Sequence, residues 1–408
     1  MSGADAIVVG GGAASIAAAR TLHDAGRDVL IVEAKDRLGG RAHSISFGDI
    51  GIDLGCGWLH SAKRNPFTTL ADAQGFSVDR SPANWRTQWR DLGFPPDDQK
   101  AFRAAWQDWE DAAHAALNGP DRPLSDFIGK HDRWQPMLDA ISGFANGAPL
   151  AHVSLHDWAA YEDAATGDNW AVREGYGTLV EHQAQALAVS LDTPVKRIDH
   201  TGRTIRVETP RGTLETEAVI LCVPASVLAD DGIAFDPPLP AKRQAAANLP
   251  LGLADKVFLK VSGLLPWPTN AHLTGNPRSN CTASHRLSPF GAPVIESFFG
   301  GDCAEGLERE GDGAAAAFAI DELVGLLGSE WRVRLEPVAA TRWRAEPYIH
   351  GSYSHARIGH AADRAVLAES IDCRLFFAGE ACSPHDFSTC HGAWQTGIAA
   401  ANALLAVQ

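Results

Sequence analysis

A glycine-rich stretch, Gly10-Gly11-Gly12-Ala13-Ala14-Ser15, lies near the start of the chain. Gly10 permits a tight turn, and Gly12 lets the backbone approach a pyrophosphate closely. A helix that begins there would direct its free N–H groups and the positive end of its dipole at the phosphates. Glu33, about 20 residues further on, can accept hydrogen bonds from a ribose. The spacing predicts a dinucleotide site, although Ser15 replaces the third glycine of the fingerprint.

Two strands and a helix are predicted to hold this turn in place. Ala6–Val9 is a short apolar run, as expected for a buried parallel strand, and Val29–Val32 is a second one. Between them an Ala-rich helix is predicted to run to about Ala25, and Gly26 is well placed to end it. Residues 5–35 are therefore predicted to form a βαβ unit. A glycine-rich turn without a ligand is the alternative, and the position of Glu33 disfavours it.

Two longer regions have their own patterns. Thr193–Val223 alternates in short runs separated by turns, which predicts a β-meander that leads into a buried strand at Ala218–Val223. Ser81–Trp134 is rich in Pro and Trp and predicts helices with irregular links. Its pairs Trp85/Trp89 and Trp106/Trp109 have helical spacing, and we interpret them as core packing or interdomain cover with no role toward a substrate.

Several segments carry a family resemblance. The sequence Arg37-Leu38-Gly39-Gly40-Arg41 directly follows Glu33, a continuation that plain NAD-binding units lack. The others are Asp53–His60, Gly252–Lys260, Thr341–Trp343, Gly351–Ser354, Leu375–Glu380 and Thr389–Trp394. In this order they resemble the flavin-dependent amine oxidases, and most of all the polyamine and spermine oxidase branch. The resemblance covers nearly the whole chain and is weakest over 71–170.

The resemblance implies an α/β fold: a Rossmann-type FAD-binding domain with a β-meander, and an inserted α+β substrate-binding domain of sheet and helices. The FAD-binding domain is expected to comprise 1–75, 175–250 and 365–408. The substrate-binding domain is expected to comprise 76–174 and 251–364. Two domains also suit a chain of 408 residues, which is too long for one compact core.

FAD is the cofactor that the resemblance implies. In monoamine oxidases a cysteine directly before a cage tyrosine holds the flavin covalently, and Ser352 stands at that position here, so FAD should be bound non-covalently. The residues expected to line the cofactor are Gly10, Gly12, Ala13, Ala14, Glu33, Ala34, Arg37, Gly39, Gly40, Arg41, Gly55, Gly57, Trp58, Val195, Trp343, Gly379, Glu380, Cys390 and Ala393.

Four residues are expected at the reacting end. Lys256 matches a lysine that holds a water against flavin N5, Tyr353 and Thr389 match the two walls of the cage before the ring, and His60 matches a histidine at the mouth of the substrate tunnel. Taken alone, each has an ordinary explanation. Lys256 could be a surface lysine on the same strand face as Lys260, His60 a structural histidine, and Tyr353 a core residue.

The predicted reaction is hydride removal from the carbon next to an amine nitrogen, with dioxygen as acceptor and aldehyde, shorter amine and hydrogen peroxide as products. A polyamine is the expected substrate, and Glu162, Asp163, Asp168, Glu174 and Glu296 are candidates to hold its charges. The alternatives are an oxidase of another primary amine, an L-amino-acid oxidase and a catalytically silent flavin-binding scaffold. L-amino-acid oxidases carry an arginine soon after the Asp/Glu-Leu-Gly step, where this chain has Cys56–His60. Carotenoid desaturases share the RxGGR motif but not the Lys256 segment.

Composition and net charge limit the partners, the metal sites and the location that can be expected. The net charge of −15 argues against a nucleic-acid partner, which needs clustered cations, and permits a cationic amine. Seven scattered cysteines without a CxxC pair suggest neither a disulfide framework nor a zinc site, and we expect no metal. No run approaches the ~20 apolar residues of a membrane helix. The first strand begins so close to Met1 that a cytoplasmic location is expected. The oligomeric state is left open between monomer and homodimer.

Overall fold

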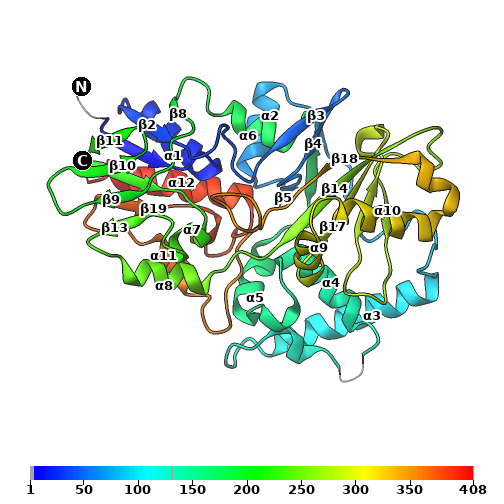
Figure 1. Cartoon of the computed structure of the whole chain (residues 1–408). Helices are drawn as coiled ribbons and strands as arrows, with labels where there is room; N and C mark the ends of the chain where they lie inside the picture. Colours follow the sequence, from blue (N-terminus) through cyan, green and yellow to red (C-terminus); the bar gives the residue numbers. More distant parts are fainter. Residues whose placement is uncertain (1–3, 130–131, 408) are drawn as a thin grey trace.

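The computed structural model describes residues 4–129 and 132–407. A five-stranded parallel sheet occupies one end of the molecule, at the left of Figure 1, and a five-stranded antiparallel sheet occupies the other end. The parallel sheet has the order β19-β12-β1-β2-β8. Its strands are β19 (Leu375–Phe377), β12 (Ala218–Leu221), β1 (Ala6–Val9), β2 (Val29–Val32) and β8 (Ala188–Ser190). Three distant stretches of the chain therefore build one sheet.

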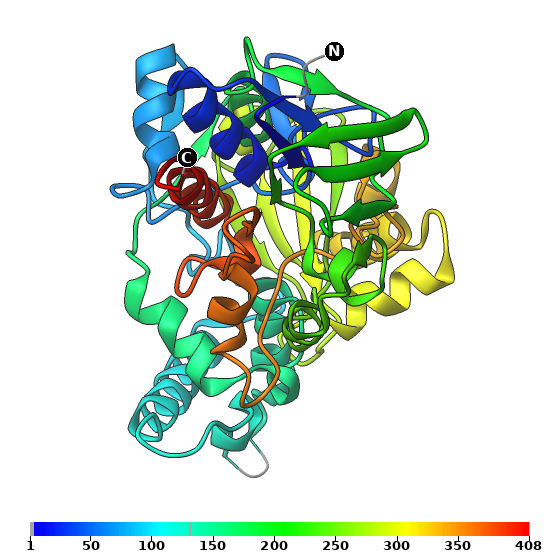
Figure 2. The ribbon, with the colours of Figure 1, turned by 90° about the vertical axis from the view of Figure 1, so that its left-hand side faces the viewer.

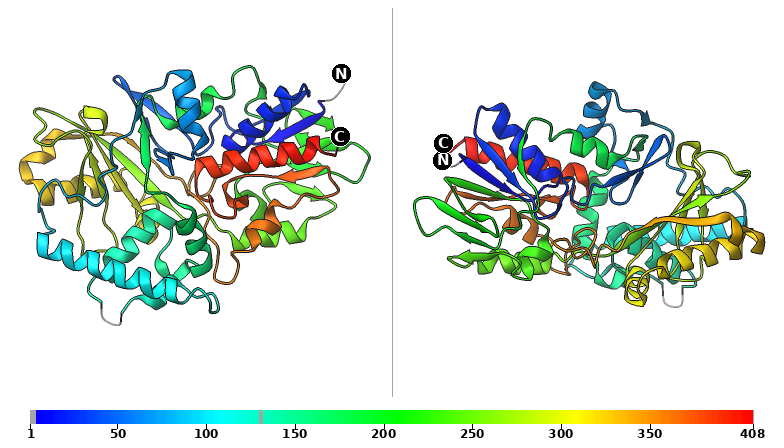
Figure 3. Two further views of the ribbon diagram at one scale, coloured as in Figure 1. Left: turned by 180° about the vertical axis from the view of Figure 1, so that it is seen from behind. Right: turned by 45° about the horizontal axis from the view of Figure 1, so that its top comes forward.

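Both faces of the parallel sheet are covered, which explains why its strands are apolar throughout. Alternate residues such as Val8 and Ile220 pack under the helices α1 (Ala13–Asp24) and α12 (Cys390–Leu405). These two helices lie side by side, as Figures 2 and 3 show. The other residues, such as Ile7 and Val219, pack against a smaller sheet of order β11-β10-β9-β13. Its strands are β9 (Arg197–Asp199), β10 (Ile205–Thr209), β11 (Gly212–Thr216) and β13 (Ala234–Asp236).

The antiparallel sheet has the order β15-β16-β17-β14-β18. Its strands are β15 (Ala271–Thr274), β16 (Ser284–Leu287), β17 (Val294–Gly300), β14 (Ala254–Val261) and β18 (Leu335–Ala340). One face packs on α9 (Asp302–Glu310) and α10 (Ala314–Leu327), where Leu259 and Leu323 belong to the same core. Helix α4 (Gln135–Asn146) covers the opposite face, where Phe144 contacts Phe298 at 5.9 Å between ring centroids.

Two glycine pairs allow α4 to approach this sheet so closely. A Cβ on Gly300 would lie 2.1 Å from the Gly143 carbonyl oxygen, and a Cβ on Gly252 would lie 2.6 Å from the Gly147 backbone. Any side chain at Gly300 or Gly252 would therefore push the helix away from the sheet. This contact places Phe144 over the face of the sheet that carries Lys256.

The remaining elements connect and cover the two sheets. Helices α3 (Pro96–Ala115) and α5 (Leu155–Ala164) share a core that includes Trp109 and Trp158 and lie below the antiparallel sheet in Figure 1. The others are β3 (Ser44–Phe47), β4 (Ile50–Asp53), β5 (Leu59–His60), β6 (Val78–Asp79), β7 (Asn169–Val172), α2 (Pro66–Gln74), α6 (Tyr176–His182), α7 (Ala225–Ala229), α8 (Pro240–Asn248), α11 (Asp363–Ala368) and the single-turn helices at Leu124–Phe127, Leu150–His152, Pro289–Gly291, Ser329–Arg334 and Glu380–Cys382.

The fold class and the βαβ unit are confirmed, including Gly26, which has a left-handed φ of 78° just beyond α1. The helical interpretation of Trp85 and Trp89 is wrong. Trp85 lies in a turn, and Trp89 donates its backbone N–H to the carbonyl of His272, because this segment runs beside the edge strand β15. The expected domain boundaries stay a prediction.

Two further findings concern the cysteines and membranes. Cys281 and Cys303 form a disulfide, which the sequence did not suggest because strand pairing and α9 bring together residues that are 22 apart in the chain. Within residues 4–129 and 132–407, none of the helices combines the length and the apolar character that crossing a bilayer requires.

Candidate active site

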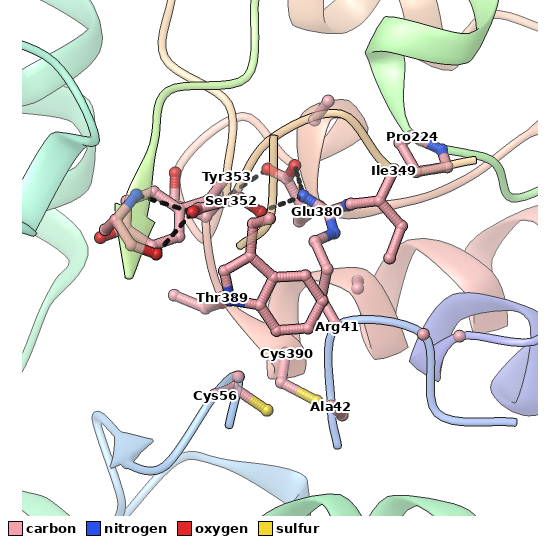
Figure 4. Close-up of a pocket in the computed structure, with 18 of the residues that line it drawn as sticks. Arg41, Ala42, Cys56, Pro224, Ile349, Ser352, Tyr353, Glu380, Thr389 and Cys390 are labelled. Carbon is pink, nitrogen blue, oxygen red and sulfur yellow. Dashed lines mark hydrogen bonds and ion pairs between the residues drawn. The ribbon is translucent and has the colours of Figure 1, made fainter. Parts of the chain in front are cut away.

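One cavity of about 1000 Å³ extends from the parallel sheet to the antiparallel sheet. It begins at the carboxyl end of β1, where Gly10 and Gly12 lie, and extends to the face of the antiparallel sheet that carries Lys256. Its wall includes every residue predicted above for cofactor or catalysis except Arg37. Figure 4 shows part of this wall, with Arg41, Glu380, Tyr353 and Thr389 arranged around the open space. The fold therefore brings together residues that are more than 300 positions apart in the sequence.

The glycine-rich turn has the geometry expected at a phosphate-binding end. Gly10 has φ = 104°, and a Cβ there would lie 2.9 Å from the carbonyl oxygen of Cys222, so only glycine fits without strain. Gly12 is the N-cap residue of α1, and no side chain caps this helix end. The first N–H groups of α1 therefore face the cavity without a side-chain partner, as an anion site requires.

Glu33 and Arg37 differ from each other in their placement. Glu33 lines the cavity, and its Oε1 accepts a hydrogen bond from the Lys35 backbone N–H at 2.7 Å. Burial raises the pKa of its carboxyl above the usual range. Arg37 lies behind the wall, where its guanidinium donates to the carbonyls of Leu38 and Gly40 at 3.0 and 2.9 Å. Arg37 thus stabilises the Gly39-Gly40 turn, and its expected contact with the cofactor stays a prediction.

Arg41 and Glu380 form a buried ion pair at the centre of the wall (Figure 4). Arg41 Nη1 lies 2.9 Å from Glu380 Oε1 and 2.7 Å from the Ser352 carbonyl oxygen. Burial opposes the charge on Glu380, but Arg41 and the Ser354 hydroxyl, 2.6 Å away, outweigh it and lower the pKa of that carboxyl. The carboxylate is therefore ionised and held rigidly beside the cavity.

The wall fits a dinucleotide in two independent ways. The uncapped N-terminus of α1 offers backbone donors to phosphates, and Arg41 adds a positive charge close by. A Cβ on Gly379, where φ is 144°, would meet no atom within 4 Å among the described residues other than its chain neighbours, so this backbone borders open space that a cofactor can fill. Ser352 uses its hydroxyl to bind both backbone polar groups of Ala254, at 2.7 and 2.8 Å, which is consistent with a non-covalent cofactor.

Lys256 lies on β14 with its ammonium inside the molecule. Nζ lies 2.9 Å from the Asp53 carbonyl oxygen and 2.9 Å from Glu296 Oε1, and the side chains of Lys256 and Glu296 are only 7% and 12% exposed. A Cβ on Gly57 would lie 3.2 Å from Nζ, so Gly57 leaves room for the ammonium. Lys260, four residues on, is half exposed and pairs with Glu336 at 3.5 Å. The interpretation of Lys256 as a surface lysine is therefore wrong.

Aromatic rings surround the space next to Lys256. The Tyr353 hydroxyl donates to the Phe144 carbonyl, which holds the ring in place, and burial raises the pKa of this phenol above its usual range. Lys256 Nζ lies 5.7 Å from the centroid of Phe298. Thr389 is the N-cap of α12, where its hydroxyl accepts from the Gly392 N–H at 3.0 Å. Phe144 and Phe298 were missed because only the docking of α4 brings them to the site.

His60 lines the same cavity. Its Nδ1 is 2.7 Å from Asn169 Oδ1, and burial lowers the pKa of the imidazole to about 4. The histidine is therefore neutral near pH 7. Trp85 packs 4.9 Å from Trp58 and 6.1 Å from His60, is 40% exposed and lines the cavity. Trp106 lines it as well. Both tryptophans border the open space, and their interpretation as cover without a role toward a substrate stays a prediction.

The acidic candidates divide into two groups. Glu162 and Glu296 line the cavity, and so does Glu110 on α3, which was not predicted. Asp168 instead pairs with Lys63 at 3.0 Å, and Glu174 accepts from the N–H and hydroxyl of Ser77. Asp163 is exposed outside this wall. In the described part of the chain, His, Cys, Asp and Glu side chains form no group of three or more that could hold a metal ion.

The chain resembles known proteins both at the level of a family and at the level of single sequences. The family model described as "Flavin containing amine oxidoreductase" matches residues 16–125 and 124–405. Polyamine oxidase 4 of Oryza sativa subsp. japonica is 28% identical, with 97% of this chain and 87% of that protein aligned. Polyamine oxidase 2 of Arabidopsis thaliana is 27% identical, with 97% and 86% aligned.

Two other similarities show the breadth of this group. Lysine-specific histone demethylase 1B of Mus musculus is 27% identical over 98% of this chain but only 52% of its own length. The solved structure of cyclohexylamine oxidase from Brevibacterium oxydans IH-35A has a TM-score of 0.79 and 21% identity, with 99% of both chains aligned. At that identity the structure supports the fold and not the substrate.

Proposed function

Because the chain belongs to the family of flavin-containing amine oxidoreductases, we propose that it is an FAD-dependent oxidase whose substrate is a polyamine. The observation that carries this proposal is the single cavity, in which the dinucleotide-binding turn and the Lys256–Tyr353–Thr389 group face the same space. FAD, when bound, accepts a hydride from the carbon next to the amine nitrogen and passes the electrons to dioxygen. Water then hydrolyses the resulting imine, so the products are an aldehyde, a shorter amine and hydrogen peroxide.

The protein's own contribution is binding, orientation and exclusion of water. Tyr353, Phe144 and Phe298 are proposed to enclose the carbon chain of the substrate, since their rings surround the space beside Lys256. Lys256 is proposed to hold a water at the reacting centre, with its ammonium directed by Asp53 and Glu296. Thr389 begins α12, whose positive dipole end favours negative charge at the cavity.

His60 is proposed to bind the substrate amine. When its Nδ1–H donates to Asn169 Oδ1, Nε2 is left as an acceptor for an N–H of the amine. With a pKa of about 4, the imidazole carries no charge that would repel an ammonium ion. The same neutral ring can receive a hydrogen bond while the amine loses its proton to water, so that the reacting nitrogen has a free electron pair.

A polyamine is supported by the carboxylates of Glu110 and Glu162, which line the cavity on α3 and α5. They are proposed to attract a distal ammonium. Relatives named polyamine oxidase at 27–28% identity over 97% of the chain also support this substrate. A different primary amine with an apolar body is the second candidate, because Phe144, Phe298 and Tyr161 make the middle of the cavity aromatic.

The test is a substrate panel. Purified protein reconstituted with FAD is mixed with spermine, spermidine, their acetylated forms, putrescine and aromatic amines, and peroxide release is measured. Fast turnover of polyamines supports the first candidate, and turnover limited to aromatic or cyclic primary amines supports the second. An L-amino acid as the preferred substrate would contradict both candidates.

A further inference from the structure

Arg364 on α11 lies behind the cavity wall, and only 1% of this residue is exposed. Its Nε and Nη2 donate to the two carboxylate oxygens of Asp157 on α5, at 2.7 and 2.8 Å. Its Nη1 donates to the Ser354 hydroxyl at 2.9 Å and to the Ala381 carbonyl at 3.3 Å. The ring of Phe387 packs against the guanidinium, with its centroid 3.6 Å from Cζ. The arginine is therefore held in one orientation on every side.

Ser354 joins this buried cation to the wall of the cavity. A hydroxyl has one hydrogen to donate, and an arginine side chain donates only. Because the Ser354 hydroxyl accepts from Arg364, its own hydrogen is left for Glu380 Oε2, 2.6 Å away. Ser354 is 1% exposed, so bulk water does not compete for this hydrogen. Arg364 thus determines the direction in which Ser354 donates.

Four donors converge on the carboxylate of Glu380. Oε1 accepts from Arg41 Nη1 at 2.9 Å and from the Ser354 backbone N–H at 3.2 Å. Oε2 accepts from the Ser354 hydroxyl at 2.6 Å and from the Ser388 backbone N–H at 3.0 Å. An ionised carboxylate has about four acceptor sites, so these bonds occupy all of them. The carboxylate therefore holds Arg41 in place and has no acceptor site left for a ligand.

Arg41 uses only one side of its guanidinium within the protein. Nη1 donates to Glu380 and to the Ser352 carbonyl, whereas Nε and Nη2 make no hydrogen bond to the described residues 4–129 and 132–407. The side chain is 25% exposed and lines the cavity. Its neighbour Gly40 touches the glycine-rich turn, since a Cβ on Gly40 would lie 3.3 Å from Gly12 Cα. Free guanidinium donors beside this turn suit the oxygens of a pyrophosphate.

The charges alternate in sign from the interior to the cavity. The order is Asp157, Arg364, Glu380 and Arg41, with the Ser354 hydroxyl between the second and the third. A buried ion pair is weak evidence for stability, because apolar residues of similar size often serve the fold equally well. Bidentate, charge-assisted hydrogen bonds do fix the geometry of the groups they join. The alternation therefore points to a role in orienting the last side chain of the series.

We propose that this series, the Arg364 relay, aims the free N–H groups of Arg41 at the pyrophosphate of the bound cofactor. The relay consists of Asp157, Arg364, Ser354 and Glu380. Its first three members lie behind the cavity wall and act as positioning residues. This inference rests on the proposed function, in which FAD occupies the cavity, and adds residues that control how tightly FAD is held.

The first variant breaks the relay without removing a charge. The FAD-loaded protein is diluted in steps without amine, and the fluorescence of released FAD gives the dissociation constant. Ser354→Ala removes the hydroxyl between Arg364 and Glu380 and should raise this constant about tenfold, as expected for one hydrogen bond to a charged group. Ser297→Ala is the matched control, because it removes a fully buried hydroxyl that lies 2.8 Å from His285 Nδ1. It should leave the constant unchanged.

Riboflavin separates positioning of Arg41 from general damage to the site. Riboflavin has no phosphate for the guanidinium to bind, so its dissociation constant from FAD-stripped protein should change less than about twofold in Ser354→Ala. Equal losses of affinity for FAD and riboflavin would mean that Ser354 merely supports the wall, and would overturn the relay.

A double-variant cycle tests whether Ser354 acts through Arg41. Both side chains bind Glu380, on different carboxylate oxygens. Arg41→Met alone should raise the FAD dissociation constant at least about thirtyfold. In the Arg41→Met background, Ser354→Ala should have no further effect, because the group that it positions is gone. Effects that multiply independently of each other would contradict the proposal.

Asp157 tests the far end of the relay. Asp157→Asn keeps the shape of the side chain, removes its charge and should weaken FAD binding about threefold. Glu322→Gln is the matched control, because Glu322 is a 10% exposed carboxylate that lies 3.0 Å from buried His285, and it should leave FAD affinity unchanged. The double variant Asp157→Asn/Arg364→Gln removes both charges and replaces Asp157→Asn if that variant does not fold. Wild-type FAD affinity in the folded variant overturns the relay.

Peroxide release is measured separately, so that the relay and the proposed function fail in different ways. If the FAD affinities follow the expected pattern but no amine of the panel releases peroxide, the relay stands and the oxidase function fails. If peroxide is released but Ser354→Ala binds FAD as tightly as the wild type, the function stands and the relay is overturned.

Discussion

The pairing of Lys256 with Glu296 makes a quantitative prediction about stability. The two side chains are 7% and 12% exposed and their charged atoms are 2.9 Å apart. Removing one member of a buried pair leaves the other charge unsatisfied, which usually costs about 3–5 kcal/mol. Lys256 keeps the Asp53 carbonyl, and Glu296 keeps Arg286 at 3.9 Å. We therefore expect Lys256→Met and Glu296→Gln each to lower the free energy of unfolding by about 3 kcal/mol.

The double variant separates the interaction from the two side chains. The double variant Lys256→Met/Glu296→Gln removes both charges together. Its loss in the free energy of unfolding should be smaller than the sum of the losses of the two single variants by about 2 kcal/mol. Urea unfolding of protein stripped of FAD, followed by fluorescence of the 12 tryptophans and by circular dichroism, measures this coupling. Without FAD, changes in cofactor affinity do not enter the result.

Strand β14 also offers a matched control. Lys260 and Glu336 are 3.5 Å apart and 50% and 67% exposed. An exposed pair of this kind should couple by less than about 0.5 kcal/mol in the same cycle. Additive effects of Lys256→Met and Glu296→Gln, or a coupling no larger than that of the control, would refute the assignment of Glu296 as the residue that positions Lys256.

Three further predictions concern the cavity. Gly12→Ala should leave the unfolding of FAD-free protein unchanged, because φ is −81° and the nearest atom to the new Cβ is 4.0 Å away. It should weaken FAD binding by about tenfold or more, since the methyl group would occupy space at the phosphate-binding turn. Equal FAD affinity of the variant and the wild type in a titration would contradict this. Lys256→Met should slow flavin reduction or reoxidation by about a hundredfold with FAD still bound, as stopped-flow absorbance would show, whereas Lys260→Met should not. Burial lowers the pKa of His60 from 6.5 to about 4 in the folded protein. As the pH falls, the unfolded chain therefore binds a proton at His60 before the folded protein does. The stability that His60 contributes is present above pH 6.5 and is lost as the pH falls toward 4. His60→Gln should lose less stability over this window, and identical pH profiles of unfolding would count against a neutral buried His60.

The sequence predicted those parts of the site that depend on local patterns. The Gly10–Ser15 turn and Glu33 lie within a short segment whose spacing determines its geometry. Arg37 lies in such a segment as well, but its side chain turns back to the Leu38 and Gly40 carbonyls, and spacing does not reveal that choice.

The substrate side of the cavity could not be predicted in the same way. Phe144 and Phe298 meet because Gly143 and Gly300 let α4 touch β17, and His272 faces the cavity because of the register between β15 and β16. Trp85 and Trp89 have helical spacing, yet pairing with the edge of β15 gives them an extended and turned backbone. Contacts between distant segments, including the Cys281–Cys303 disulfide, override the local signal in this half of the chain.

Anaerobic mixing of the FAD-loaded protein with an amine would show whether a flavin bound in this cavity is reduced by the amine. If the ring of a bound flavin lies beside Lys256 and Tyr353, its yellow absorbance should bleach at a rate that saturates with amine concentration and return when oxygen is admitted, with peroxide formed in equal amount. Purified protein that remains yellow with every amine of the panel would instead indicate a flavin-binding scaffold without turnover. Protein that takes up no FAD would contradict both the cofactor assignment and the proposed function.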